Sequence, residues 1–199
     1  MLRVGLTGGI ACGKSHVLRR LAAHGLATVD LDAVAHGLMA PGGAAYVDVV
    51  AAFGPRILAP DGAIDRKALG ARVFGDAAAR ARLDALVHPR VRAEEALRAA
   101  ALEAEGWPLL VSDAALLVEA GAHLRFDRLV VVHCPPEEQQ LRLVRRDGIP
   151  EDAARARVSA QMPVEEKRRY AHSEIDTSGT VGETEAAADA LAESLLALA

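Results

Sequence analysis

Residues 8–15 read Gly-Gly-Ile-Ala-Cys-Gly-Lys-Ser, which fits the pattern Gly-x-x-x-x-Gly-Lys-Ser/Thr at every fixed position. A β-rich run, Arg3–Thr7, precedes this segment, and a helical pattern from Ser15 to His24 follows it. Glycines let successive backbone N–H groups converge on one point, and the start of a helix adds its positive dipole there. The feature therefore predicts a strand, a phosphate-binding loop and a helix. It disfavours the alternative of a glycine-rich turn that only caps a helix.

This loop also predicts how a nucleotide is held. Lys14 supplies a cation to the β- and γ-phosphates, and Ser15 offers a hydroxyl ligand to Mg²⁺. Cys12 is interpreted as a small residue that suits a tight loop, with a redox or nucleophilic role as the alternative. The residues expected to bind the nucleotide are Gly8, Gly9, Ala11, Cys12, Gly13, Lys14, Ser15 and His16.

The rest of the chain has the pattern of an α/β protein with a parallel sheet. Ala27–Asp30 completes a strand–helix–strand unit, Leu109–Asp113 and Leu129–His133 resemble strands covered on both faces, and Glu174–Asp176 is a short fifth strand. From Glu183 onward a helix is expected to dock through one face, formed by Ala188, Leu191, Leu195 and Leu198. The expected fold is a three-layer αβα domain of the P-loop NTPase type with a five-stranded parallel sheet.

Two helical stretches extend this domain, which we expect to span residues 1–199 as a single unit. Residues 34–105 are too long for a plain crossover and predict an inserted helical subdomain that walls an acceptor pocket. Breaks in its helices are expected at 41–43, 60–62 and 88–89.

The second stretch, residues 142–170, is dense in arginine and broken at 147–150. It predicts a mobile helical lid over the site. The mixed charges of Glu165–Arg169 are interpreted as a solvated helix face.

The composition of the chain limits the kinds of partner that it is expected to bind. The net charge is −4, which argues against general nucleic-acid or membrane-surface binding, and no apolar stretch approaches the roughly 20 residues that span a bilayer. The two cysteines, Cys12 and Cys134, form no CxxC pair and predict neither a zinc site nor a disulfide framework. We expect a cytoplasmic monomer or weak homo-oligomer without nucleic-acid or membrane partners.

Carboxylates follow two of the expected strands, at the edge where parallel sheets bind ligands. Asp30 and Asp32 follow the second strand, where one can accept the proton of an acceptor hydroxyl and the other can hold Mg²⁺ through water. Capping of the next helix is the alternative. Asp113 ends the third strand and is a candidate to support Mg²⁺, with a strand-end turn as the alternative. No Asn-Lys-x-Asp motif is present, which disfavours a GTPase.

The chain resembles the dephospho-CoA kinase family from residue 3 to about residue 180. The stretches that carry the resemblance are Leu6–Ile10, Asp30–His36, Phe53-Gly54, Asp61-Gly62, Asp65-Arg66, Leu86–Pro89, Leu116–Glu119, Gln140–Arg142, Arg146-Asp147, Ala160–Met162, Glu166–Arg168 and Ile175-Asp176. The phosphate loop is common to many families. The Asp-x-Asp, His-Pro and Leu-Leu-x-Glu segments together are much more specific.

This resemblance implies that ATP, with Mg²⁺, donates its γ-phosphoryl group to the ribose 3′-hydroxyl of dephospho-CoA, giving CoA and ADP. It makes Asp32 the general base with Asp30 in support, and it places Thr7 facing the phosphates. Arg142 and Arg146 would clamp phosphates from the lid, which suits a transfer that depends on charge neutralisation and excluded water. A solvated helix face is the alternative for these arginines.

Two further residues are candidates for contacts with the acceptor. His88, before Pro89, can touch it, although packing or capping is the commoner role of a histidine in a helical subdomain. Leu117, in the Leu-Leu-x-Glu segment, is the other candidate.

Three residues depart from the family pattern. Ala115 stands where proline is usual, His36 where arginine is common, and Thr177 where asparagine is usual. The last difference puts in doubt a side-chain contact from that loop to adenine. Two other functions stay open: a kinase for another small hydroxyl acceptor, such as a nucleoside or nucleotide, and a nucleotide-dependent switch that regulates a partner.

Overall fold

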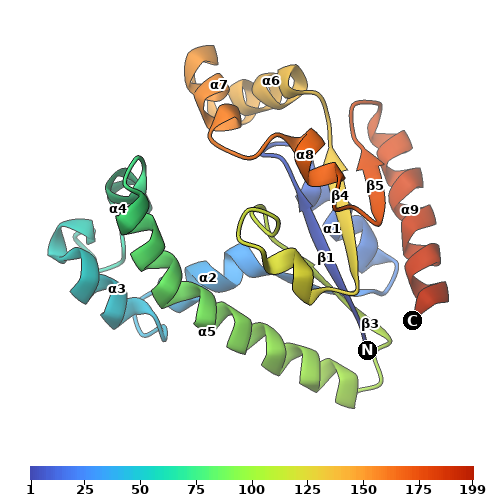
Figure 1. The fold of residues 1–199 in the computed structure, drawn as a ribbon, viewed down its shortest axis with the longest axis horizontal. Coiled ribbons are helices and arrows are strands. Elements are labelled where there is room, and N and C mark those ends of the chain that lie inside the picture. The colour runs from blue at the N-terminus through green and yellow to red at the C-terminus, as the bar shows by residue number, and fades with distance from the viewer. The chain divides into compact units, whose positions relative to one another are not determined.

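A parallel sheet of five strands forms the core of the first of two units into which the chain divides; this unit comprises residues 1–30 and 102–199. The computed structural model describes the whole chain, residues 1–199. The strands are β1 (Leu2–Gly8), β2 (Ala27–Asp30), β3 (Leu109–Asp113), β4 (Arg128–His133) and β5 (Ser173–Asp176). Their order is β2-β3-β1-β4-β5, and every neighbouring pair is parallel (Figure 1). The expected sheet is confirmed, and β3 lies between the first two strands of the chain.

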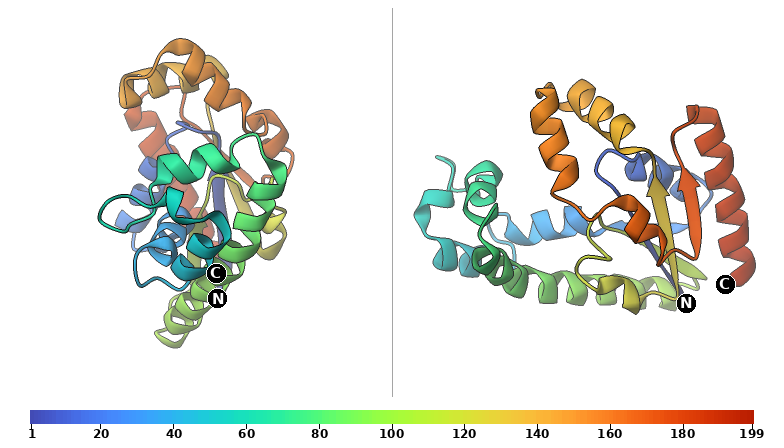
Figure 2. Two further views of the ribbon diagram at one scale, coloured as in Figure 1. Left: turned by 90° about the vertical axis from the view of Figure 1, so that its left-hand side faces the viewer. Right: turned by 45° about the horizontal axis from the view of Figure 1, so that its top comes forward.

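One face of the sheet is covered by α1 (Lys14–Ala23) and α9 (Val181–Leu198), which also contact each other. Leu6 of β1, Leu21 of α1 and Leu195 of α9 belong to the same buried cluster. Figure 2 shows α9 running alongside β5 at the edge of the sheet. The prediction that Leu198 joins the docking face is wrong, because this residue is 53% exposed in the last turn of α9, next to the end of the chain.

The opposite face of the sheet is covered by shorter elements. A Cβ on Gly5 in β1 would come within 2.8 Å of the ring of Phe126, so the glycine makes room for this aromatic side chain. Phe126 follows the 3₁₀ helix η2 (Ala122–Arg125), and α8 (Val164–Arg168) contacts β4. Elements therefore pack on both faces, which confirms the three-layer arrangement.

Two helices follow β4, α6 (Pro136–Asp147) and α7 (Glu151–Ser159), and they pack against each other. Gly148, with φ of 63°, ends α6 in the left-handed conformation that glycine adopts most easily. Arg146 and Arg157 both donate to Asp147, and the hydrogen bond from Arg146 comes first among the causes that lower the pKa of this carboxyl. The break expected at 147–150 is present, and a second one separates α7 from α8.

The second unit, residues 31–101, is helical. Its elements are α2 (Leu31–Met39), α3 (Tyr46–Phe53), the 3₁₀ helix η1 (Pro55–Ile57), α4 (Arg66–Val73) and most of α5 (Ala77–Ala104). The Tyr46 hydroxyl donates to the carbonyl of Gly62 across this unit. Asp65 caps α4 by accepting from the amides of Lys67 and Ala68.

The helix break expected at His88-Pro89 is absent, because α5 continues through Pro89 for 28 residues. A proline inside a helix removes the amide that would donate to the carbonyl four residues earlier, which here is that of Ala85. The guanidinium of Arg90 donates to the next carbonyl along the helix, that of Leu86, and also pairs with Asp48 of α3. The burial of Val87, Val91, Glu95 and Ala99, one residue per turn, keeps the helix in place on both sides of the proline. Neither α5 nor any other helix is apolar over a length that would cross a membrane.

Candidate active site

The phosphate loop joins the carboxyl end of β1, the central strand, to the start of α1. Gly13 has φ of 81°, and Ala11, with φ of 59°, is the one non-glycine residue of the chain with a positive φ. A left-handed backbone costs a residue that carries a Cβ on the order of 1 kcal/mol. The loop therefore holds local strain, as functional loops often do, at a position that the motif leaves unspecified.

The start of α1 presents backbone donors that the chain does not use itself. The amides of His16 and Val17 donate to the carbonyl of Gly13. The amides of Lys14 and Ser15 come before the first hydrogen bonds of the helix and have no acceptor within it. No side chain caps the helix, and its first turn contains no acidic residue. With the positive end of the helix dipole, these free donors form a site for an anion.

Lys14 lies beside this anion site, with its Nζ 3.4 Å from Oδ1 of Asp113. Asp113 is only 4% exposed at the end of β3, and the strand register pairs it with Asp30 at the end of β2. The two carboxylates therefore end adjacent strands, and Asp113 holds the lysine ammonium at the carboxyl edge of the sheet.

The oxygen donors around the loop suit Mg²⁺ that arrives with a nucleotide. No group of three or more His, Cys, Asp or Glu side chains is arranged to hold a metal ion. Ser15 is exposed at the start of α1, and Asp113 supplies a buried carboxylate nearby. A hydroxyl and one carboxylate fit this ion, since Mg²⁺ usually keeps waters and phosphate oxygens as its other ligands.

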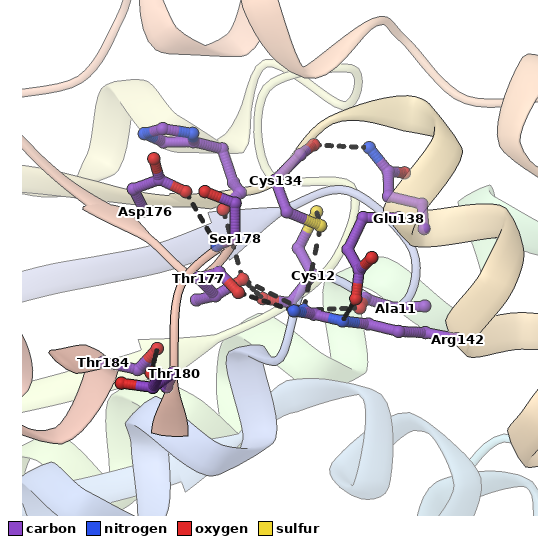
Figure 3. A network of polar contacts seen from close by, with 12 residues as sticks. Ala11, Cys12, Cys134, Glu138, Arg142, Asp176, Thr177, Ser178, Thr180 and Thr184 are labelled. Atoms are coloured by element: carbon purple, nitrogen blue, oxygen red, sulfur yellow. Dashed lines mark hydrogen bonds and ion pairs between the residues drawn. The ribbon is translucent and has the colours of Figure 1, made fainter. Parts of the chain in front are cut away.

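Behind the loop, Thr177 and Arg142 contact its carbonyl groups (Figure 3). The Thr177 hydroxyl donates to the carbonyl of Cys12 over 2.9 Å and accepts from Nη1 of Arg142 over 3.1 Å. The same guanidinium donates to the carbonyl of Thr177 over 2.5 Å and lies 3.5 Å from that of Ala11. Glu138 accepts from Nε of Arg142 one turn away on α6. Arg142 therefore lies on the carbonyl side of the loop.

Cys12 and Cys134 are 122 residues apart in the chain, yet their sulfur atoms lie 3.6 Å apart as buried free thiols. The contact with Cys12 and the cationic Arg142, whose Nη1 is 3.8 Å from the sulfur, lower the pKa of the Cys134 thiol. The same contact and burial raise the pKa of Cys12. This pairing was not predicted, because spacing along the chain does not show it.

Two residues outside the predicted set also reach the loop. Lys167 is fully buried, so the interpretation of Glu165–Arg169 as a solvated face is wrong for this residue. Its Nζ lies 3.4 Å from the carbonyl oxygen of Gly8. Gln161, between α7 and α8, accepts from the amide of Ile10 through Oε1 over 2.8 Å. One segment distant in the sequence therefore contacts the peptide groups on both sides of Gly9.

The other predicted residues of the first unit have varied surroundings. Thr7 is buried, and its hydroxyl donates to the carbonyl of Ala115 over 3.1 Å. Leu117 is a core residue, and Nε2 of His16 lies 3.3 Å from a carboxylate of α9. Arg146 is exposed and paired with the neighbouring Asp147.

Two predicted residues belong to the helical unit. Asp32 is exposed in the first turn of α2, two residues beyond the end of β2. His88 is half-exposed on α5, where its Nε2 lies 3.4 Å from Asp84, one turn earlier. His88 is therefore neither a core residue nor a helix cap.

Several contacts to the loop come from residues to which the sequence analysis gave no role. They are Lys167, Gln161, Thr177 and Cys134, and Glu119 acts on the loop only through its ion pair with Lys167. Gln161, Lys167 and Glu119 lie within stretches that carry the family resemblance, which was the available signal. Lys167 was overlooked because four other charged residues surround it in the chain.

Comparison with known proteins gives one consistent result. The family model described as dephospho-CoA kinase matches residues 2–183. A dephospho-CoA kinase of Geobacter sulfurreducens is 48% identical over 182 residues, covering 92% of each chain. A crystal structure from Thermus thermophilus is 34% identical, with a TM-score of 0.84, covering 98% of this chain and 97% of that one. The dephospho-CoA kinase of Campylobacter jejuni is 26% identical, with a TM-score of 0.70, covering 97% and 96%.

Proposed function

The chain belongs to the dephospho-CoA kinase family, and we therefore propose that it transfers the γ-phosphoryl group of ATP to the ribose 3′-hydroxyl of dephospho-CoA. The products are CoA and ADP, and the reaction is the last step of CoA biosynthesis. ATP and dephospho-CoA are its small-molecule partners.

The observation that carries this proposal is the anion site at the start of α1. Its free amides and the ammonium of Lys14 converge where β1 ends, as a polyphosphate chain requires. Phosphoryl transfer depends mainly on positioning and on neutralising charge at the transferred group. Lys14 would leave its contact with Asp113 to share its charge with the β- and γ-phosphates.

Ser15 and Asp113 are the groups that would hold Mg²⁺, Ser15 directly and Asp113 through water. The ion would neutralise charge on the β- and γ-phosphate oxygens.

Acceptor activation belongs to the same proposal. Asp32 would take the proton of the attacking hydroxyl, with Asp30 supporting it at the end of β2. Asp30 ends β2, and Asp32 follows it by two positions in the chain. His88 and Leu117 would contribute acceptor contacts.

Arg142 and Arg146, which follow β4, would bind phosphates from a helical lid that comprises residues 142–170. Each would exchange a protein partner for a phosphate, Arg142 releasing Thr177 and Arg146 releasing Asp147. Residues 34–105 would form the acceptor-binding insertion of a single kinase domain. A cytoplasmic monomer or weak homo-oligomer completes the proposal.

The test is ADP release by the purified chain with Mg·ATP and a panel of acceptors: dephospho-CoA, adenosine, AMP and none. Turnover that requires dephospho-CoA supports the proposal. Turnover with adenosine or AMP would favour a nucleoside or nucleotide kinase, and hydrolysis independent of acceptor would favour a switch. Lys14→Met is expected to lower kcat/KM for ATP by about 10²–10³-fold, since it removes a charge-stabilising donor. Lys67→Met, at an exposed lysine on α4, is the matched control.

A further inference from the structure

The short segment from Gln161 to Lys167, which leads from α7 into α8, contacts the phosphate loop twice. Lys167 donates to the carbonyl of Gly8, and Gln161 accepts from the amide of Ile10. The two contacted groups flank Gly9, which links the end of β1 to the rest of the loop. One segment more than 150 residues away in the chain therefore holds the loop at both sides of one glycine.

Lys167 is the better buried of the two side chains, with no exposed surface. Its ammonium has three acceptors: Oε1 of Glu119 at 2.8 Å, the carbonyl of Ala115 at 2.9 Å and that of Gly8 at 3.4 Å. An ammonium has three N–H groups, so this geometry uses its full donor capacity. The carbonyl of Ala115 also accepts from Thr7, the last residue before the loop.

These contacts set the direction of two consecutive peptide groups. In a trans peptide the C=O and the following N–H point in opposite directions. Lys167 draws the Gly8 carbonyl toward itself, so the amide of Gly9 points away from the ammonium. Gln161 holds the amide of Ile10, so the carbonyl of Gly9 points away from Gln161, and this carbonyl accepts from the amide of Cys12.

Gly9 needs such external contacts because it has no Cβ to restrict its own dihedral angles. A larger residue is not a substitute here, since a Cβ on Gly9 would lie 2.8 Å from Oε1 of Gln139 and 3.0 Å from the sulfur of Cys12. Gly9 is therefore a flexible residue in a narrow space, and neighbouring side chains determine how the peptide groups on either side of it are oriented.

We propose that Gln161 and Lys167 are positioning residues for phosphoryl transfer, which orient the peptide groups on either side of Gly9 so that the loop is preformed for a polyphosphate. The inference rests on the proposed function. The same ammonium fixes Ala115 and Glu119, in the segment that follows Asp113. The Lys167 side chain thus fixes the position of the loop relative to the segment that follows Asp113.

A purely stabilising role explains Lys167 poorly. Burying the Lys167 ammonium removes a charge from water, and a well-packed apolar residue of similar volume often serves stability equally well. The specific product of the Lys167 contacts is the orientation of backbone groups in the loop.

The experiment compares two variants by isothermal titration with Mg·ADP and by steady-state kinetics. Lys167→Met with Glu119→Gln removes the charge and its partner together, so that neither charge is left without the other. Gln161→Met removes the acceptor of the Ile10 amide in a side chain of similar length. Leu195→Ala, in the core side of α9, is the control that lowers stability without touching the loop.

Both loop variants are expected to bind Mg·ADP about tenfold or more weakly and to lose a similar factor in kcat/KM for ATP, because small misplacements of binding groups are costly. KM for dephospho-CoA should stay within about twofold of wild type. Leu195→Ala should melt at lower temperature yet bind Mg·ADP as wild type does. Wild-type affinity for Mg·ADP in both folded loop variants would overturn the inference. A wild-type chain that binds no Mg·ADP would instead overturn the proposed function, so the two failures are distinguishable.

Discussion

Thr177 offers a sharp test of how the phosphate loop is held from behind. Its side chain is 4% exposed, and its hydroxyl joins the carbonyl of Cys12 to the guanidinium of Arg142. Thr177→Val replaces this hydroxyl by a methyl group of nearly the same shape. The change therefore leaves no cavity, and its effect reports the lost hydrogen bonds alone.

The magnitude follows from which groups are left without partners. The carbonyl of His133, the second acceptor of the hydroxyl, keeps the amide of Thr177 at 2.9 Å. Arg142 keeps the Thr177 carbonyl and Glu138. The carbonyl of Cys12 loses its donor, and an unsatisfied buried polar group costs about 1–3 kcal/mol. For a chain of this size, 2 kcal/mol corresponds to a fall in Tm of about 4–8 °C.

Thr184→Val is a matched control for the same substitution on α9 (Figure 3). Thr184 is 6% exposed, and its hydroxyl donates to the carbonyl of Thr180 over 3.2 Å. The amide of Thr184 already donates to that carbonyl over 3.1 Å, so removing the hydroxyl leaves no acceptor without a donor. The expected change in the free energy of unfolding is within about 0.5 kcal/mol.

Urea denaturation of both variants, followed by circular dichroism, measures the difference. If the m-values match wild type, the shift in midpoint gives the change in stability directly. The reasoning would be refuted if Thr177→Val were no more destabilising than Thr184→Val. That result would mean that the Cys12 carbonyl does not depend on the threonine.

Asp32→Asn is expected to keep Mg·ADP binding and lower kcat by about 10²-fold, because it removes the base but not the phosphate site; near-normal turnover in the acceptor assay would exclude Asp32 as the base. Gly8→Ala would place a Cβ 2.2 Å from the carbonyl oxygen of Val132, so β1 and β4 would have to move apart. This should lower the free energy of unfolding, measured in urea, by about 1–3 kcal/mol or more, and it should abolish the binding of Mg·ADP in titration. A folded variant with wild-type affinity contradicts that contact. Arg20 holds the pKa of Asp189 below its ordinary value, so Asp189→Asn should lower stability above about pH 4. The difference in stability between Asp189→Asn and wild type should shrink as the pH falls below this value. A difference in stability that grows in acid would contradict a lowered pKa of Asp189.

Local patterns predicted the elements of the sheet closely. All five strands occur within one residue of the expected runs, because short apolar runs between turn signals have few other interpretations. The order of the strands was not predicted: a strand–helix–strand unit shows that two strands are parallel but not that β3 pairs between them. The helix through Pro89 shows the opposite limit, where tertiary burial and the Arg90 side chain override a local breaking signal.

For the candidate site too, contacts between residues close together in the chain were predicted, whereas contacts between distant residues were not. The motif predicted the loop, Lys14 and Ser15, since these groups act near one another in the chain. The contacts of Thr177 and Lys167 with the loop span 165 and 159 residues, and no local pattern encodes such a pair. The charges around Lys167 pointed toward solvent, whereas burial depends on where Glu119 and the Gly8 carbonyl lie in space. The roles of Asp32, His88, Arg142 and Arg146 stay predictions.

The central position of β1 has a consequence for how the chain is made. Leu2 pairs with Leu109, so the first strand leaves the ribosome about a hundred residues before its neighbour β3 exists. Gln161, Lys167 and Thr177, which hold the loop, emerge later still. The nucleotide motif is thus translated well before the residues that shape it, and a nascent chain released before Thr177 carries the motif without those contacts.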